Sequence, residues 1–282
     1  MIETIDDFAR SLNDSGQTDV IALDFSKAFD KVPHQRLIYK LHHYGIHGHL
    51  LTWIKQFLTN RTQCVMLDGQ ESFFTMVSSG IPQGTVLAPL LFLCYINDLS
   101  DQVVLRVRLY ADDVLLYSPV NSDCDYYNLQ NHINSLLKWT QDWQMEFNPK
   151  KCEFLRITKK KQVTQFTYYI GSCPIQEVPF IKYLGVSIDN QLTWNEHIKR
   201  ITSKAISVKS FLQRNLSSCP IKVKINCYKS LVRPILEYAS IVWSPHTQLN
   251  INKVEKIQRQ AARFIKNNFS WHSSVSNMLQ IT

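Results

Sequence analysis

The chain has 282 residues, of which 45% are hydrophobic, and its formal net charge is +8 at pH 7. This length and composition exclude a disordered tail and favour two domains. The longest apolar run, VLAPLLFLCYI at residues 86–96, is well short of the roughly 20 residues that a membrane helix needs. The acidic start MIETIDDFAR lacks the pattern of a signal peptide, so we expect an intracellular protein without membrane attachment.

The seven cysteines are scattered and include no C-x-x-C pair. This pattern indicates reduced thiols rather than a disulfide framework or a zinc site. The histidine-rich segment HHYGIHGH, residues 42–49, could contribute metal ligands, but it contains no Cys or Glu at ligand spacing. Its composition favours a solvated connection between helices.

The positive charge is concentrated in the last third of the chain. From residue 196 onward there are 14 Lys and Arg residues and 3 acidic residues, whereas the preceding part has 17 basic and 20 acidic residues. Such asymmetry suggests a basic lobe that holds a polyanion. An ordinary Lys-rich helical surface explains the charge equally well.

In chain order, the pattern predicts strands and helices in alternation. After an amphipathic N-terminal segment, residues 18–25 form a β-rich run, and helical spacing follows over residues 33–46 and 49–60. Residues 62–77 predict two strands joined at the Asp68-Gly69 turn. A loop then leads into a buried apolar helix within residues 78–99.

The second half begins with an alternating strand over residues 103–110. A helix is expected around residues 129–144, then a turn and several strands over residues 152–188. From about residue 193 the period is helical throughout. We therefore predict an α+β body over residues 1–190 and a basic helical domain over residues 191–282.

Three carboxylates lie where predicted strands give way to turns: Asp24, Asp112 and Asp113. Strand ends of one sheet can converge, and carboxylates within about 4 to 6 Å of one another repel unless a cation neutralises them. Mg²⁺ prefers oxygen ligands, and two such ions can clamp the attacking and leaving oxygens of a phosphoryl displacement. Alternatively, Asp112 and Asp113 are simple turn formers at a hairpin tip.

Five segments in order carry a family resemblance: ALDFSKAFDKVPH, SGIPQGTVLAPLLFLCYINDL, YADDVLLY, FNPKKCEFL and IKYLGVSID. Together they resemble the reverse transcriptases of non-LTR, LINE-type or jockey-like retrotransposons. The resemblance implies a polymerase palm with an antiparallel sheet, packed helices and residual fingers, followed by a helical thumb and post-thumb segment. It also implies RNA-directed DNA polymerase activity with two Mg²⁺ ions, an RNA template, a DNA primer and deoxynucleotides.

The resemblance assigns roles to individual residues. Asp24 and Asp112 would bridge the metals with the main-chain carbonyl of Phe25, and Asp113 would support them. Lys151 would protonate the pyrophosphate leaving group. Further residues are implied in nucleotide binding, namely Phe29 as a steric gate beside Ala28, and the loop formed by Pro82, Gln83 and Gly84. Nucleic-acid contacts are implied for Tyr110, for Tyr183, Leu184 and Gly185 of a primer-grip hairpin, and for Lys199, Arg200, Lys204 and Arg263.

The chain also departs from the family pattern. The basic fingers residues would precede Asp24, where this sequence has one base, Arg10, and the endonuclease would lie further upstream. We therefore expect an N-terminally truncated fragment whose fingers and endonuclease belong to a parent polyprotein. Nuclear action on target DNA is the expected setting.

Other functions remain open at this point. The alternatives are a catalytically dead remnant that binds nucleic acid and a relic with no activity. A viral RNA-dependent RNA polymerase fits less well because of ADD, Gln83 and Phe29. Group II intron and telomerase polymerases share the palm motifs, but DFSKAFDKVPH and the tail match LINE-type elements better. Ribonuclease H activity has no second carboxylate cluster to support it.

Overall fold

A computed structural model describes residues 1–161, 163 and 165–270, which form two compact units. The sheet unit is Ser15–Val178, and the helical unit combines Met1–Asp14 with the described part of Pro179–Thr282. This division differs from the domain boundary expected after residue 190, because the hairpin before that point packs on the first long helix of the helical unit. The assignment of palm and thumb remains a prediction.

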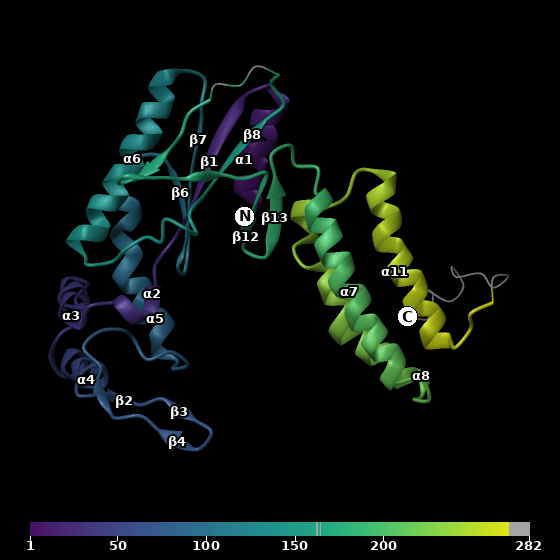
Figure 1. Ribbon diagram of the computed structural model, residues 1–282, viewed down its shortest axis with the longest axis horizontal. Helices are drawn as coiled ribbons and strands as arrows, with labels where there is room; N and C mark the ends of the chain where they lie inside the picture. The colour runs from purple at the N-terminus through teal and green to yellow at the C-terminus, as the bar shows by residue number, and fades with distance from the viewer. Residues whose placement is uncertain (162, 164, 271–282) are drawn as a thin grey trace. The chain divides into compact units, whose positions relative to one another are not determined.

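A five-stranded sheet organises the sheet unit, in the order β11-β8-β1-β7-β6. β1 lies at its centre and pairs antiparallel with both β7 and β8. The edge strand β11 pairs parallel with β8. The sheet is therefore mixed, whereas a wholly antiparallel sheet was expected. The α+β fold class is confirmed (Figure 1). The strands are β1 (Gln17–Asp24), β6 (Arg106–Tyr110), β7 (Asp113–Pro119), β8 (Glu153–Thr158) and β11 (Gln176–Glu177).

Alternating residues of the central strands feed one large core. Ile21 and Leu23 of β1 join Val114 and Leu116 of β7 in this core, because residues two apart point to the same face of a sheet. Helices of the same unit supply much of the rest of the core. They include α2 (Ala28–Lys31), α3 (His34–His43), α4 (Gly48–Leu58), α5 (Leu87–Ile96), η1 (Asn97–Gln102) and α6 (Asp123–Asp142).

The expected hairpin over residues 62–77 is present, in two short ladders. Asp68 and Gly69 both have positive φ, 50° and 79°, as a two-residue type I′ turn requires. The inner ladder joins β3 and β4, and the outer one joins β2 and β5. These strands are β2 (Thr62–Gln63), β3 (Met66–Leu67), β4 (Gln70–Glu71) and β5 (Thr75–Met76).

Helix α5 is exposed on one face, although its apolar sequence predicts a helix buried on all sides. Leu91, Phe92 and Tyr95 are buried against the core, whereas Leu90 and Leu93 are 57% and 48% exposed. Apolar residues all around a helix predict burial on every side, but here the helix packs on one face only. Among the described residues, no helix is long and apolar enough to cross a membrane.

The helical unit contains one small hairpin and several helices. Its core is formed by α7, α8, η2, α9 and α11, with Leu212, Val232 and Ile265 buried. After the hairpin, Asp189 accepts hydrogen bonds from the backbone of Gln191, Thr193 and Trp194, which fixes the turn into α7. The elements are α1 (Ile2–Asn13), β12 (Phe180–Tyr183), β13 (Val186–Asp189), α7 (Asn195–Asn215), α8 (Ile221–Cys227), the π-helix η2 (Tyr228–Val232), α9 (Arg233–Glu237), α10 (Ser240–Trp243) and α11 (Gln248–Lys266).

Candidate active site

Two of the predicted carboxylates lie opposite each other at one end of the sheet. Asp24 is the last residue of β1, Asp113 is the first residue of β7, and the two are register partners. Register partners in an antiparallel pair have Cβ atoms about 4.5 to 5.5 Å apart on the same face. Asp112 precedes β7 in the tight turn after β6, so the turn rather than the sheet sets its position. The register thus pairs Asp24 with Asp113, whereas the family pattern implies a pair of Asp24 and Asp112.

The turn that carries Asp112 is strained at Ala111. This residue has a φ of +52°, a conformation that costs a residue with a Cβ atom roughly 1 to 2 kcal/mol. Strain of this kind persists where the surrounding structure over-determines it, and it is common at functional sites. The paired strands β6 and β7 hold the turn on both sides through the pair formed by Tyr110 and Asp113.

Asp24 is held by its backbone and faces a lysine. Its N–H points to Cys152 Sγ at 3.5 Å, and its carbonyl accepts a hydrogen bond from Asn148 N at 2.8 Å. Burial, the largest cause, raises the pKa of Cys152 to about 11, so this thiol stays neutral beside the carboxylate. Asp24 Oδ2 is buried and accepts no hydrogen bond, while Lys151 Nζ lies 3.3 Å from it without hydrogen-bond geometry. The structure thus brings Lys151 to Asp24.

Phe25 is buried, and its backbone orientation follows from its neighbours. Its ring stacks on Phe147 at a centroid distance of 4.7 Å. Ser26 N donates to Glu146 O on the same side as the bond to the Asp24 carbonyl. Because successive residues of an extended chain direct their N–H and C=O groups to opposite sides, the Phe25 carbonyl is directed away from this side. It therefore faces the side on which β7 begins at Asp113.

These groups have the chemistry that a hard cation needs. Carboxylate and carbonyl oxygens are the donors that Mg²⁺ prefers, and the buried Oδ2 of Asp24 has an ion pair with Lys151 but accepts no hydrogen bond. In the described part of the chain, no three Asp, Glu, His or Cys side chains are grouped closely enough to hold a metal ion. The donor set therefore fits Mg²⁺ in kind, while the predicted convergence of three carboxylates is not formed.

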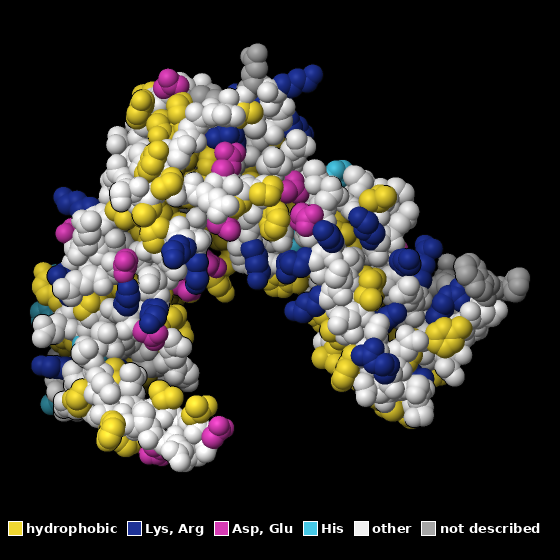
Figure 2. Space-filling view, in the orientation of Figure 1, with side chains coloured by type: hydrophobic (Ala, Val, Ile, Leu, Met, Phe, Trp, Pro, Cys, Tyr) yellow, Lys and Arg dark blue, Asp and Glu magenta, His cyan; other side chains and the backbone are white. Residues whose placement is uncertain are grey.

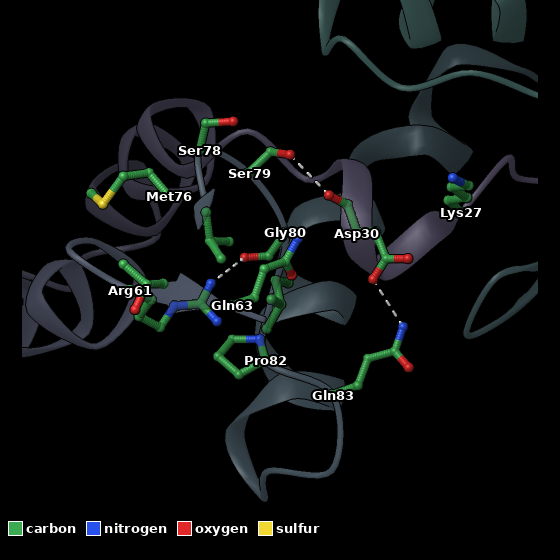
Figure 3. Close-up of a pocket in the computed structure, with 13 residues that line it drawn as sticks. Lys27, Asp30, Arg61, Gln63, Met76, Ser78, Ser79, Gly80, Pro82 and Gln83 are labelled. Carbon is green, nitrogen blue, oxygen red and sulfur yellow. Dashed lines mark hydrogen bonds between the residues drawn. The ribbon is translucent and has the colours of Figure 1, made fainter. Parts of the chain in front are cut away.

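The loop that carries Pro82, Gln83 and Gly84 is anchored on α2 through Gly80. Gly80 has a φ of +89°, and a Cβ atom at this position would lie 2.7 Å from the carbonyl oxygen of Asp30. Its own carbonyl accepts hydrogen bonds from Arg61 at 3.0 Å and from His34 Nε2 at 2.8 Å. Figure 3 shows this loop beside Asp30, with Arg61 on the far side of Gly80.

The nucleotide-binding residues expected from the resemblance divide between this loop and the core. Gln83 Nε2 donates to Asp30 Oδ1 at 3.1 Å, and Gly84 has a φ of +82° with open space where a Cβ atom would lie. Ala28 is buried, and Phe29 stacks on Phe92 of α5 at a centroid distance of 4.6 Å. Phe29 therefore already packs against the core, and its steric-gate role remains a prediction.

A polar cavity of about 770 Å³ lies against this loop (Figure 3). Pro82 and Gln83 line it together with Lys27, Asp30 and Arg61. Its lining combines cationic, anionic and amide groups. A cavity of this size and polarity can accommodate a polar ligand of nucleotide dimensions.

The expected primer-grip residues form the turn of the β12–β13 hairpin. Leu184 and Gly185 have φ values of +45° and +81°, as a two-residue type I′ turn requires. Tyr183 is buried at 6% exposure, so its ring packs inside the helical unit. Tyr238 Oη donates to the Leu184 carbonyl at 2.9 Å, and Arg200 donates to the Gly185 carbonyl. The guanidinium of Arg200 therefore binds the backbone of this turn.

The remaining predicted nucleic-acid contacts lie on the long helices of the helical unit. Lys199 and Lys204 are exposed on α7, and Lys199 has a loose ion pair with Glu196 at 3.9 Å. Arg263 of α11 donates to the Ser270 carbonyl at 2.5 Å. In Figure 2, Lys and Arg side chains are spread over the visible face of these helices and acidic ones are sparse. Tyr110, in the sheet unit, is 63% exposed at the end of β6.

Several residues that shape the site were not predicted from the sequence. Asp30 lies within the recognised segment DFSKAFD, and Gly80 lies before the Pro-Gln-Gly turn, so each had a local signal. Arg61 had none. Its donation to the carbonyls of Leu58 and Gly80 depends on how the hairpin folds back on the loop.

Comparisons with known proteins show which family the sequence matches. A family model described as "Reverse transcriptase (RNA-dependent DNA polymerase)" matches residues 3–188. The RNA-directed DNA polymerase from mobile element jockey of Drosophila melanogaster is 29% identical over 86% of this chain and 28% of its own length. The probable polymerase from transposon BS of the same species is 27% identical over 91% and 30%. The chain thus spans less than a third of these relatives.

Solved structures give a weaker likeness. Telomerase from Candida tropicalis in complex with a telomeric RNA fragment has a TM-score of 0.48 at 11% identity, covering 99% of this chain and 51% of its own. The RNA-dependent RNA polymerase of a human picobirnavirus has a TM-score of 0.38 at 14% identity, covering 100% and 53%. Both scores are low, so family membership rests on the sequence match. The chain belongs to the reverse transcriptase family and is related to the jockey and BS polymerases of non-LTR retrotransposons.

Proposed function

We propose that this chain is the catalytic part of an RNA-directed DNA polymerase, which extends a DNA primer on an RNA template with deoxynucleotides. The primer 3′-hydroxyl attacks the α-phosphate of the nucleotide, and pyrophosphate leaves. The single observation that carries the proposal is the opposition of Asp24 and Asp113 at the ends of β1 and β7, inside a family match that spans both.

The oxygen donors of the site supply its cation binding. Asp24, Asp112 and Asp113, with the main-chain carbonyl of Phe25, would hold two Mg²⁺ ions, which when bound stabilise the negative charge that develops at the phosphate. Asp24 and Asp113 lie at the ends of two paired strands, and this pairing limits the movement of their carboxylate oxygens. Lys151, 3.3 Å from Asp24 Oδ2, is an ammonium close enough to this centre to protonate the departing pyrophosphate.

The loop and the helical unit would select and hold the substrates. Pro82, Gln83 and Gly84 would contact the nucleotide and the templating base. Phe29 would exclude a 2′-hydroxyl from the sugar site. The hairpin turn at Leu184 and Gly185 would contact the primer, and Lys199 and Lys204 would contact phosphates through salt-sensitive, sequence-independent attraction. Fingers and endonuclease segments of a parent polyprotein would complete the enzyme, and target DNA would place its action in the nucleus.

Primer extension tests the proposal. Purified chain is incubated with Mg²⁺, a labelled DNA primer annealed to RNA, and either deoxynucleotides or ribonucleotides. We expect extension with deoxynucleotides that EDTA abolishes. Absence of extension by a folded, monodisperse chain would refute the activity for this chain, and extension restricted to ribonucleotides would refute the choice of substrate.

A second function has its own supporting observation, the basic helices of the helical unit (Figure 2). Nucleic-acid binding without polymerisation would use the same lysines and no metal. Affinity for a primer and template duplex, measured at increasing salt, would then fall steeply. Lys204→Gln should weaken binding and reduce the salt slope by about one, whereas Lys138→Gln, on α6 of the sheet unit, should leave both unchanged. Equal behaviour of the two variants would exclude this role for Lys204.

A further inference from the structure

We propose that Asp30 is a positioning residue that fixes the side-chain amide of Gln83, so that its carbonyl oxygen Oε1 is presented to the incoming nucleotide as a hydrogen-bond acceptor. The inference deepens the proposed polymerase function and rests on it for the identity of the ligand. An amide can donate or accept. The hydrogen bond to Asp30 determines whether Gln83 presents its donor or its acceptor to the nucleotide.

The backbone brings Asp30 and Gln83 together independently of their side chains. Gly80 N donates to Val32 O and Ile81 N donates to Phe29 O, both at 2.8 Å. The missing Cβ of Gly80 lets the loop approach Asp30 so closely that any other residue would overlap its carbonyl oxygen. The loop is therefore docked on α2 immediately before Gln83.

The opposite side of the loop is held as well. The Gly80 carbonyl accepts from Arg61, and from His34 Nε2, which must carry the proton because a carbonyl oxygen cannot donate. His34 is buried, and Arg61 also donates to the Leu58 carbonyl. With bonds on both sides, the loop has little freedom to carry Gln83 away from Asp30.

The chemistry of the two side chains then determines the orientation. Gln83 Nε2 lies 3.1 Å from Asp30 Oδ1. A carboxylate accepts hydrogen bonds and donates none, so the amide must turn its NH₂ group toward Asp30. Figure 3 shows the consequence: the amide oxygen of Gln83 points away from Asp30. Both side chains are exposed, so the bond contributes orientation more than stability.

Two readouts test this inference. The first is the KM for deoxynucleotides in primer extension, compared among wild type, Asp30→Ala, Asp30→Asn and Gln83→Met. We expect Asp30→Ala and Gln83→Met each to raise KM roughly tenfold with a smaller change in kcat, as the loss of about one hydrogen bond predicts. Asp30→Asn has an amide that can donate as well as accept, so it fixes the orientation of Gln83 less strictly, and its KM should lie between those of wild type and Asp30→Ala. In the Gln83→Met background, Asp30→Ala should have no further effect, because Asp30 acts through Gln83.

The second readout requires no activity. The side-chain NH₂ resonances of Gln83 in the full chain, labelled with ¹⁵N, should shift toward solvent-exposed values in Asp30→Ala and shift by less in Asp30→Asn, whose amide can still accept from Gln83. If wild type fails to extend primers while these resonances shift, the proposed function is wrong and the orientation stands. Unmoved resonances would overturn the inference. So would extension by wild type with additive effects of Asp30→Ala and Gln83→Met.

Discussion

Lys40 is a buried ammonium whose titration should be visible in the stability of the whole sheet unit. Its side chain is 4% exposed, it forms an ion pair with Asp98, and it donates to the Tyr95 carbonyl at 2.6 Å. Its Nζ also lies 3.7 Å from the ring centroid of Trp143 and 4.6 Å from that of Trp139. Burial outweighs these partners and lowers its pKa from 10.5 to about 8.

The sign of the pH effect follows from this lowered pKa. Between about pH 8 and 10.5 the unfolded chain keeps the Lys40 proton and the folded chain releases it, so folding is favoured increasingly as pH rises. At about 1.36 kcal/mol per pKa unit, the shift corresponds to roughly 3 kcal/mol of unfolding free energy gained across this window. Below pH 8 the cost of burying the charge is fully present.

The assay is urea unfolding of wild type and Lys40→Met at a series of pH values. Other groups titrate in the same range. For example, the pKa of Tyr95 is raised by burial, and such groups are common to both chains. The difference in unfolding free energy, wild type minus variant, should therefore rise by about 3 kcal/mol from about pH 7 to 10.5. Lys55→Met, at an exposed position of α4, is the matched control: it retains Lys40, so its difference from wild type should stay flat over the same pH range. A flat difference for Lys40→Met would refute the reasoning.

Three further changes probe the loop and the turns. Gly80→Ala should lower the unfolding free energy by roughly 2 to 4 kcal/mol and raise the nucleotide KM, because the added Cβ would overlap Asp30. Gly84→Ala, also at positive φ but in open space, should lower it by only about 1 kcal/mol. Equal losses of the two variants in urea unfolding would contradict this. Ala111→Gly should stabilise the chain by up to about 1 kcal/mol, because glycine tolerates the φ of +52°, and a lower urea midpoint would contradict it. Asp189→Ala should destabilise the helical unit by roughly 2 to 4 kcal/mol, because four hydrogen bonds to this side chain are lost, as measured by circular dichroism during unfolding. The stability of Asp189→Asn should fall between those of Asp189→Ala and wild type. An unchanged stability of Asp189→Ala would show that Asp189 does not stabilise the turn into α7.

The sequence was informative wherever a local rule decides the structure. Strand β1, the Asp68-Gly69 hairpin and the helical last third follow from β-rich composition, turn chemistry and the 3.6-residue period, respectively. The family motifs identified Asp24 and the two turn carboxylates, and the β1–β7 register places Asp24 opposite Asp113.

What the sequence could not indicate depends on tertiary contacts. The exposed face of α5 could not be predicted, because its apolar residues surround the helix evenly and the choice of buried face is made by α3. The sequence around Lys40 is typical of a surface lysine, yet aromatic rings of α5, of α6 and of Trp143, directly after α6, surround its ammonium. The N-terminal helix α1 joins the helical unit through contacts with α10, far away in the sequence.

The most direct test of the central claim is primer extension by carboxylate variants. Asp24→Asn, Asp112→Asn and Asp113→Asn are compared with wild type at saturating Mg²⁺ and deoxynucleotide, and Asp101→Asn serves as an exposed control in η1. We predict that each of the three site variants loses at least about a hundredfold in kcat, while the control matches wild type and all variants keep the wild-type urea midpoint within error. Extension at the wild-type rate by any of the three site variants would contradict the assignment of this strand-end site as the catalytic centre.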